Sequence, residues 1–189
     1  MSACSLQTRR ILLRRWREED FDAFARLSAS PVVMDYLRPL PERAASDAVV
    51  RRINEHFSQY GFGFWVAELP GICPFIGFVG LEHVRFVAHF TPAVHVAWRL
   101  DPIYWGHGYA TEAARTAMAD GFLRIGLNEI VAMTVPANYR SRRVMERLGM
   151  KRAEIDDFDH PLVPDGHPLK GRVLYRLQRT EWQQTAAGG

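Results

Sequence analysis

The sequence has few of the features that mark metal sites, disulfide frameworks or membrane spans. It contains two cysteines, Cys4 and Cys73, which match no zinc or disulfide spacing. No apolar run is long enough to cross a bilayer, and the apolar stretch 11–13 is too short for the core of a signal peptide. We therefore predict a cytoplasmic protein with reduced, inert thiols, no metal and no membrane contact.

The sequence also lacks a strong excess of positive or negative charge. The formal net charge is +3, from 24 basic and 21 acidic residues, and the arginines are spread along the chain. A nucleic-acid-binding domain usually gathers its basic residues on one face, so nucleic acid is not an expected partner. The 189 residues, of which 48% are hydrophobic, are enough for one domain with a substantial core.

The most informative stretch reads Asp101-Pro-Ile-Tyr-Trp-Gly-His-Gly-Tyr-Ala-Thr-Glu-Ala-Ala-Arg115. An apolar strand, 94–100, runs into it, and an amphipathic helix, 110–124, leaves it. Gly106 and Gly108 lie between them, where glycine permits a tight turn and close approach of a ligand. A helix N-terminus offers unpaired N–H groups and positive potential, so the stretch predicts a cradle for phosphate. The alternative is an ordinary turn.

Two common phosphate motifs do not fit this stretch. A Walker loop would need Gly-Lys-Ser/Thr, which does not follow the glycines. A dinucleotide fingerprint would need glycine where the sequence has Thr111. The expected ligand is therefore a diphosphate held in some other way.

The order of elements indicates an α/β (α+β) fold. Strands are expected over 9–16, 64–68, 75–83, 94–100, 129–135 and 172–179, and helices from 18, over 42–60, 110–124 and 141–148. A short turn at Pro70-Gly71 makes the second and third strands antiparallel. We expect one domain over 1–189, with a core of about 8–178, flexible ends at 1–7 and 183–189, and a mixed sheet flanked by helices.

Two motifs carry a family resemblance. Tyr104-Trp-Gly-His-Gly-Tyr-Ala-Thr-Glu-Ala113 resembles the acetyl-CoA pyrophosphate loop of the GCN5-related N-acetyltransferase (GNAT) superfamily, which reads Gln/Arg-x-x-Gly-x-Gly/Ala. It is most similar to the branch typified by the ribosomal-protein N-terminal acetyltransferases, where Trp often takes the first place. Asn138-Tyr-Arg-Ser141, followed by Val144-Met-Glu-Arg-Leu-Gly-Met150, resembles that family's Asn-x-x-Ser…Glu-Lys-Leu-Gly-Phe signature. The resemblance covers about residues 8–178.

The resemblance implies both a fold and a reaction. The fold is a mixed, mostly antiparallel central sheet in which a splayed pair of parallel strands binds acyl-CoA. The reaction is direct attack of a primary amine, either a protein N-terminus or a small-molecule amine, on acetyl-CoA in a ternary complex. It implies acetyl-CoA as the co-substrate and no metal, and a homodimer is compatible with it.

The resemblance also implies the residues that contact the cofactor. Backbone N–H groups of 105–111 hold the pyrophosphate, and a main-chain N–H of the strand 96–100 orients the thioester. Asn138 reaches the cofactor or, alternatively, only caps its helix. The expected contacts are Val96, Trp98, Leu100, Trp105, Gly106, His107, Gly108, Tyr109, Ala110, Thr111, Asn138 and Ser141. Arg142 or Arg143 is a further candidate, for the 3′-phosphate.

Three residues are candidates for proton transfer. Many relatives outside this branch donate a proton from a tyrosine where this chain has Met145, so Ser141 or water must serve; Ser141 can instead be a helix cap. His95 occupies a strand position where a glutamate often stands, and its ordinary pKa suits a base near neutrality. Glu82 is a second candidate base. The alternatives are an ordinary core or surface histidine and an exposed strand carboxylate.

The acceptor is poorly encoded. Tyr36 and Trp65 are expected either to line the acceptor groove or to pack in the core. The long loop 156–171 contains acids and the histidines His160 and His167, which would meet the acceptor, although the loop can also be a surface or dimer contact. Its spacing matches no metal motif.

Two other functions stay open at this stage. Met145 and the missing strand glutamate leave room for a non-catalytic acyl-CoA-binding sensor or scaffold of the same fold. A nucleotide-binding protein is a further alternative, against which the absent Walker lysine counts.

Overall fold

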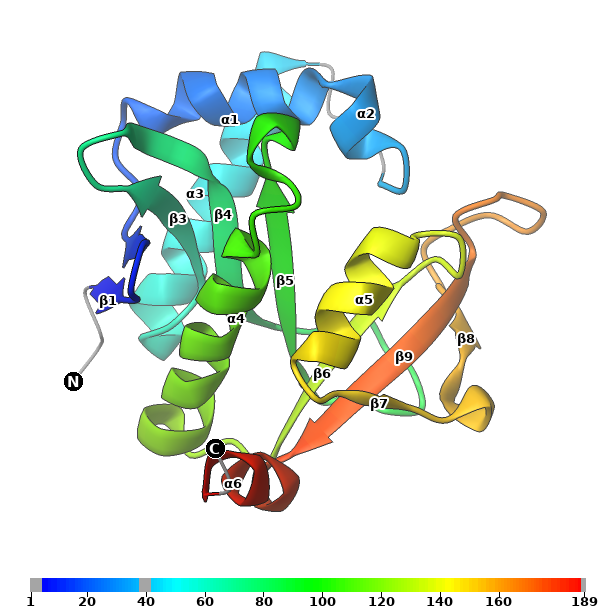
Figure 1. The fold of residues 1–189 in the computed structure, drawn as a ribbon. Helices are drawn as coiled ribbons and strands as arrows, with labels where there is room; N and C mark the ends of the chain where they lie inside the picture. The colour runs from blue at the N-terminus through cyan, green and yellow to red at the C-terminus, as the bar shows by residue number, and fades with distance from the viewer. Residues whose placement is uncertain (1–4, 38–41, 188–189) are drawn as a thin grey trace. The chain divides into compact units, whose positions relative to one another are not determined.

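The computed structural model describes residues 5–37 and 42–187. The chain forms two compact units, Met1–Glu82 with Ala97–Ala117, and His83–Val96 with Met118–Gly189 (Figure 1). We refer to them as the first and the second unit and describe each by itself. The single domain expected from the sequence stays a prediction.

The strands of the first unit pair in chain order. They are β1 (Ser5–Gln7), β2 (Leu12–Arg14), β3 (Phe64–Leu69), β4 (Cys73–His83) and the later part of β5 (Val94–Leu100). The order along the sheet is β1-β2-β3-β4-β5, and β1 to β4 pair antiparallel with one another. The turn between β3 and β4 contains Gly71, whose φ of 75° explains the glycine.

Strand β5 approaches β4 very closely at Gly77. A Cβ atom added to Gly77 would lie 2.1 Å from the carbonyl oxygen of Arg99, and the φ of this glycine is +134°. Just beyond, the amide of Asp101 donates to the carbonyl oxygen of Ile76 at 2.9 Å. Only glycine satisfies both the backbone angle and the lack of space, so Gly77 sets where β5 ends against β4.

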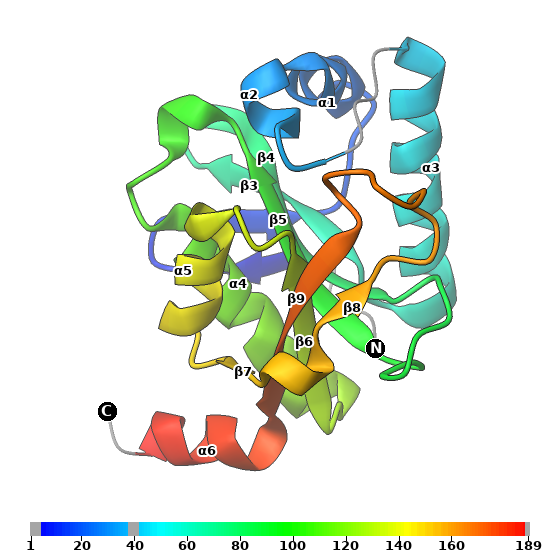
Figure 2. The same ribbon diagram turned by 90° about the vertical axis from the view of Figure 1, so that its right-hand side faces the viewer.

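Helices lie on both sides of these strands. The first unit contains α1 (Asp20–Ala29), α2 (Pro31–Met34), α3 (Arg43–Tyr60), the 3₁₀ turn η1 (Pro102–Tyr104) and most of α4 (Tyr109–Asp120). Figures 1 and 2 show α3 and α4 on opposite sides of β3 and β4. The buried residues of α3 include Val50, Ile53 and Phe57, whose spacing places them on one helical face, and the helix ends at Gly61 with a φ of 74°.

An aromatic cluster forms part of the core of the first unit. Trp16 and Phe24 meet edge to face at 5.3 Å, and Phe78 lies 5.9 Å from Phe24 and 5.2 Å from Phe64, measured between ring centroids. All four side chains are buried. Burying each aromatic ring stabilises the fold by about 1.5–3 kcal/mol, so this cluster holds α1 on β3 and β4.

The second unit is built on one long antiparallel pair. It contains the start of β5, the π-helical turn η2 (Gly121–Ile125), β6 (Glu129–Thr134), α5 (Tyr139–Arg147), β7 (Lys151–Arg152), the 3₁₀ turn η3 (Glu154–Asp156), β8 (Phe158–Asp159), β9 (Gly171–Gln178) and α6 (Arg179–Ala187). β6, β7 and β8 each pair antiparallel with β9. β5 pairs parallel with β6, where His95 lies opposite Val131.

The expected fold class is confirmed. The protein has a mixed α/β fold with a mostly antiparallel sheet, flanking helices and the parallel pair β5–β6. The helix expected over 42–60 and the strand expected over 94–100 agree with α3 and β5 to within one residue. Gly126, with a φ of 82°, ends the central helical segment as expected.

Several elements differ from expectation, at the ends of the chain and in the loop 156–171. Residues 5–7 form β1 and 183–187 belong to α6, although both ends were expected to be flexible. The first strand expected over 9–16 is only Leu12–Arg14, and the loop 156–171 contains β8. Cys4 lies outside the described residues. Short strands and a polar helix give weak periodicity, which explains why the sequence did not reveal them.

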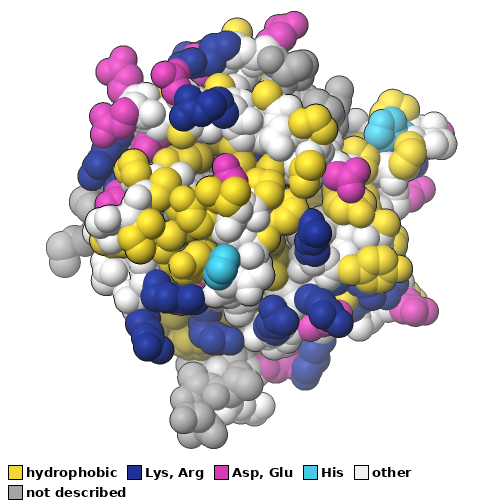
Figure 3. Space-filling model, turned by 45° about the horizontal axis from the view of Figure 1, so that its top comes forward, with side chains coloured by type: hydrophobic (Ala, Val, Ile, Leu, Met, Phe, Trp, Pro, Cys, Tyr) yellow, Lys and Arg dark blue, Asp and Glu magenta, His cyan; other side chains and the backbone are white. Residues whose placement is uncertain are grey.

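The surface is mixed in character. Figure 3 shows hydrophobic and basic side chains exposed on the same face. Ile103 and Tyr139 are among the exposed large hydrophobic residues, at 71% and 68% exposure. Within residues 5–37 and 42–187, no helix combines the length and the apolar character that a membrane crossing requires.

Candidate functional site

The glycine turn has the backbone geometry that the sequence suggested. Gly106 and Gly108 have φ angles of 81° and 80°, which side chains with a Cβ rarely adopt. A Cβ added at Gly106 would meet nothing within 4 Å, and one at Gly108 would meet only Nη2 of Arg10, at 3.6 Å. Protein crowding therefore does not explain the two glycines. The turn needs them for its backbone angles and leaves open space beside it.

Helix α4 begins directly after this turn. Its first helical hydrogen bond runs from the amide of Glu112 to the carbonyl oxygen of Gly108, at 3.0 Å. The amides of Tyr109, Ala110 and Thr111 therefore precede the first i→i−4 bond of the helix. Residues 106–108 are exposed. The open turn and the helix N-terminus together have the donors and the positive potential that a diphosphate requires.

The start of the turn is tied back to the strand. Nε1 of Trp105 donates to the carbonyl oxygen of Leu100 at 2.8 Å. The carboxylate of Asp101 accepts from the amide of Ile103 at 3.1 Å, which caps η1. A hydrogen bond with Cys73, together with burial, raises the pKa of Tyr104 to about 12. The bonds made by Trp105 and Asp101 hold the turn in one place without using the amides of residues 106–108.

The first turn of α4 is clamped to the N-terminal segment. The carboxylate of Glu112 accepts from Oγ1 of Thr8 at 2.6 Å, and from the amide and Nε of Arg10 at 2.9 and 2.7 Å. The guanidinium of Arg10 also lies over the ring of Tyr109, 4.5 Å from its centroid. Burial alone would raise the pKa of Glu112, but the bonds from Thr8 and Arg10 hold it below its ordinary value.

We refer to Thr8, Arg10 and Glu112 as the N-terminal clamp. Sequence analysis missed it, and the only signal was a glutamate in a first helical turn, which is common for dipole reasons alone. Arg10 neutralises this carboxylate, so the negative charge beside the turn does not oppose an anion there.

The candidate cofactor residues of β5 divide between the units. Leu100 and Trp98 lie in the first unit, and Val96 lies in the second. Leu100 and Val96 are 4% and 2% exposed, so their side chains are core and only their backbone can serve a ligand. Trp98 is half-buried.

Asn138 and Ser141 lie in the second unit, at the start of α5. Oδ1 of Asn138 accepts from the amide of Ser141 at 3.1 Å, and its Nδ2 donates to Oγ1 of Thr134 at 3.1 Å. The helix-cap role of Asn138 is therefore present, and a cofactor contact stays a prediction. The hydroxyl of Ser141 has no hydrogen-bond partner within residues 5–37 and 42–187, and Met145 is 2% exposed in the core.

The two candidate bases have different surroundings. Glu82 is 5% exposed, so it is not the solvent-facing carboxylate that was its alternative. Its Oε1 lies 3.7 Å from Nε of Arg52. His95 is half-buried on β5, in the second unit.

The residues expected to meet the acceptor are dispersed. Trp65 is 0% exposed and packs edge to face on Phe57 at 5.2 Å, which is a core position and not a groove lining. Tyr36 is half-buried at the end of the segment that follows α2. Both belong to the first unit.

His160 and His167 belong to the loop of the second unit. His160 packs against Phe86 at 4.3 Å between ring centroids, and burial lowers its pKa. The exposed His167 accepts from the amide of Leu169 at 3.1 Å. Within the described part of the chain, no three His, Cys, Asp or Glu side chains form a group suited to a metal ion.

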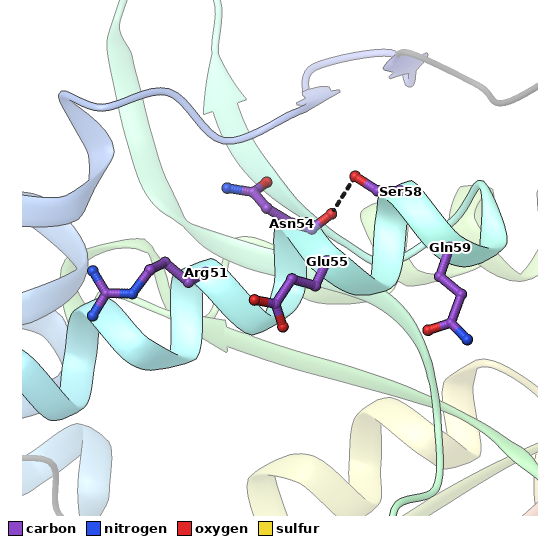
Figure 4. A pocket seen from close by; sticks show the side chains of 5 residues that line it. All are labelled: Arg51, Asn54, Glu55, Ser58 and Gln59. Atoms are coloured by element: carbon purple, nitrogen blue, oxygen red, sulfur yellow. Dashed lines mark hydrogen bonds between the residues drawn. The ribbon is translucent and has the colours of Figure 1, made fainter.

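A surface depression lies elsewhere in the first unit, on the outer face of α3. Figure 4 shows that all five side chains lining it come from this one helix: Arg51, Asn54, Glu55, Ser58 and Gln59. Ser58 donates to the carbonyl oxygen of Asn54 at 2.9 Å, so part of its polar lining is already satisfied. The depression contains none of the candidate site residues, and we do not assign a ligand to it.

Comparisons with known proteins agree with this geometry. The Acetyltransferase (GNAT) domain model matches residues 10–151. The FsC-acetyl coenzyme A-N(2)-transacetylase of Aspergillus fumigatus is 31% identical over 187 residues, covering 94% of this chain and 77% of the relative. An uncharacterized N-acetyltransferase of Bacillus subtilis is 27% identical over 179 residues, covering 94% of this chain and 98% of the relative.

A solved structure supports the same conclusion. The acetyltransferase (GNAT family) from Bacillus anthracis superposes with a TM-score of 0.76 at 25% identity, covering 94% of this chain and 99% of that one. Since the domain model matches most of the chain, the protein belongs to the acetyltransferase (GNAT) family and is an N-acetyltransferase.

Proposed function

We propose that this protein transfers the acetyl group of acetyl-CoA to a primary amine by direct attack in a ternary complex. The acceptor is a protein N-terminus or a small-molecule amine. The observation that carries the proposal is the open turn at Gly106 and Gly108, whose left-handed backbone leads into the N-terminus of α4. GNAT enzymes use acetyl-CoA, and this turn fits a pyrophosphate because it offers amides, positive potential and free space.

The chain's own residues would divide the work as follows. Amides of 106–111 hold the pyrophosphate, while Trp105 and the N-terminal clamp keep the turn and the helix start in position. A main-chain N–H of β5 would orient the thioester carbonyl, and one such donor lowers a barrier by about 3 kcal/mol. Bound acetyl-CoA supplies an activated carbonyl carbon with a thiolate leaving group.

The proton balance assigns two further roles. The acceptor nitrogen bonds to the carbonyl carbon, the carbon–sulfur bond breaks, the nitrogen loses a proton and the thiolate gains one. We propose Ser141 as the donor to the departing sulfur, because its hydroxyl has no other partner in the described residues. His95 or Glu82 would take the amine proton, directly or through water. An α-amine with a pKa of about 7.7–8.0 needs little help, whereas a lysine amine near 10.4 needs more.

The branch and the acceptor rest on different support. Trp105 and the two glycines favour the ribosomal-protein N-terminal acetyltransferase branch, through the loop resemblance alone. The name of the fungal relative describes transfer from acetyl coenzyme A to N(2) of FsC, which supports nitrogen as the acceptor atom. We propose no metal and leave the oligomeric state, including a homodimer, to measurement.

The first test is the melting temperature as a function of acetyl-CoA, CoA and ATP concentration. A ligand present at 100 times its dissociation constant adds about 2.7 kcal/mol of stability. We expect an upward shift with acetyl-CoA and CoA and none with ATP, followed by thiol release when an amine is added. No shift with acetyl-CoA would overturn the proposal. A shift without thiol release from any amine would favour a sensor.

A further inference from the structure

Arg99 has an unusual position near the end of β5 in the first unit. Its Nη1 donates to Oγ of the fully buried Ser28 on α1, at 3.1 Å. Its guanidinium carbon lies 5.6 Å from the ring centroid of Phe24 and 5.3 Å from that of Phe78. The side chain is partly buried, and no acidic side chain pairs with it among residues 5–37 and 42–187.

A second guanidinium lies nearby on α3. Burial, and then the charge of Arg52, lower the pKa of Arg99 to about 10. The carboxylate near Arg52 is that of Glu82, and its Oε1 is 3.7 Å from Nε, beyond hydrogen-bond distance. The Nε atoms of Arg99 and Arg52 are both buried without a hydrogen-bond partner in the described part of the chain. We refer to Arg99, Arg52 and Ser28 as the arginine cluster.

The charges of the arginine cluster do not balance. Two guanidinium groups face one carboxylate, and the neighbours of Arg99 are a hydroxyl and two aromatic rings. Burying a cation without a partner costs free energy, so such a charge is seldom kept for stability. A guanidinium offers planar paired donors that match a carboxylate or a phosphate. The cluster therefore has one positive charge to spare for an anion that residues 5–37 and 42–187 do not supply.

This cluster is separate from the glycine turn. The side chain of Arg99 contacts α1, and Arg52 belongs to α3, whereas the turn opens at the N-terminus of α4. Figure 2 shows α3 and α4 on opposite sides of the strands of the first unit. An anion at the cluster is therefore a different group from the pyrophosphate at the turn.

We propose that Arg99, assisted by Arg52, binds an acidic group of the acceptor, so that the acceptor is a primary amine that also carries a carboxylate or a phosphate. This inference rests on the proposed acetyl transfer to an amine. Arg99 is then a specificity-determining residue: it selects the acceptor and takes no part in proton transfer.

The test compares acceptors that differ only in the acidic group. One pair is 4-aminobutyrate and butylamine, and the other is phosphoethanolamine and ethanolamine. Binding is measured by calorimetry, and thiol release gives kcat/KM. In at least one pair, we expect the acidic amine to have a kcat/KM about tenfold or more above that of the neutral amine. The neutral amine lacks the charge-assisted hydrogen bond to Arg99, and a difference of this size corresponds to the loss of one such bond. The pair that shows the preference identifies the acidic group as carboxylate or phosphate.

Variants then locate the preference. Arg99→Gln should lower kcat/KM for the acidic amine to the value for its neutral counterpart. Arg52→Gln should reduce the preference for the acidic amine in part. Arg99→Gln should leave kcat/KM for the neutral amine unchanged, and neither variant should change the melting shift with acetyl-CoA. The matched control is Arg51→Gln, since Arg51 is the neighbouring arginine on the outer face of α3 and should leave both preferences intact.

Two results would overturn the inference. One is that neither acidic amine has a higher kcat/KM than its neutral counterpart. The other is that Arg99→Gln lowers kcat/KM equally for the acidic and the neutral amine. The proposed function fails separately. If acetyl-CoA gives no melting shift, acetyl transfer is overturned, while calorimetry with the acids still decides whether Arg99 binds an anion.

Discussion

The first unit contains two regions suited to anions, and they are built in opposite ways. The glycine turn uses backbone amides, positive φ angles and a helix N-terminus. The arginine cluster uses side chains from α1, α3 and β5. A site made of backbone amides tolerates side-chain substitutions as long as the backbone keeps its conformation. A site made of side chains can change its ligand preference through one substitution. We infer that the first suits a cofactor common to a family and the second suits an acceptor that differs between members.

The largest effect should come from changing the backbone of the turn. Gly106→Val forces a β-branched residue to a φ of 81°, at a cost of about 1–3 kcal/mol if the path is kept. We expect acetyl-CoA affinity to fall about 10- to 100-fold, measured by calorimetry.

The matched control for this change is Gly71→Val. Gly71 has a φ of +75° and likewise nothing within 4 Å of an added Cβ. It should lose similar stability and keep its affinity. Equal affinity losses in the two variants would mean that the turn has no special role.

The next effect concerns the N-terminal clamp. Glu112→Gln should lower the free energy of unfolding by about 1–2 kcal/mol, a figure reduced because Arg10 is partly exposed. Because the folded-state pKa of Glu112 lies below its ordinary value, the carboxylate contributes stability above the unfolded pKa, and this contribution is lost as pH falls through the folded pKa.

Denaturant titrations at several pH values measure this difference. The gap between the wild type and Glu112→Gln should be full at pH 7 and should close in acid. A gap that is constant over this range would show that the charge of Glu112 does not matter.

A smaller effect of opposite sign is expected at the arginine cluster. Arg99→Met removes a charge that burial and Arg52 disfavour, so the protein without ligand should become more stable by about 1 kcal/mol at pH 7. Thermal melts of both proteins test this, and a less stable Arg99→Met would show that Arg99 is structural.

The smallest effect should come from the side chain that ties back the turn. Trp105→Phe removes the hydrogen bond to Leu100, worth about 1 kcal/mol net, and leaves the amides of the turn in place. Acetyl-CoA affinity should change less than about fivefold. A loss as large as that of Gly106→Val would contradict the view that the backbone does the binding.

The same contrast explains what the sequence revealed. The turn, β5 and the start of α4 are contiguous, and glycines at fixed offsets between a strand and a helix are a local signal. The fold class followed from the order and periodicity of such local elements. These features need no knowledge of distant contacts.

The clamp and the cluster depend on distant contacts. Thr8 and Glu112 are 104 residues apart, and Ser28 and Arg99 are 71 apart. Arg99 alternates with apolar neighbours on β5 and is typical of a solvent-facing strand position in sequence. The sequence around Trp65 is compatible both with a core position and with a groove lining, and only its complete burial identified it as core.

Gly77 limits how this protein can diverge. Any larger residue there would collide with the backbone of Arg99, so a side chain at position 77 would force the end of β5 away from β4. If Arg99 selects the acceptor as we propose, redesign of acceptor choice, by evolution or in the laboratory, would exchange side chains on β5 and keep its backbone in place. Arg99 is the first position that we would randomise in such a library, and Gly77 is the one to leave alone.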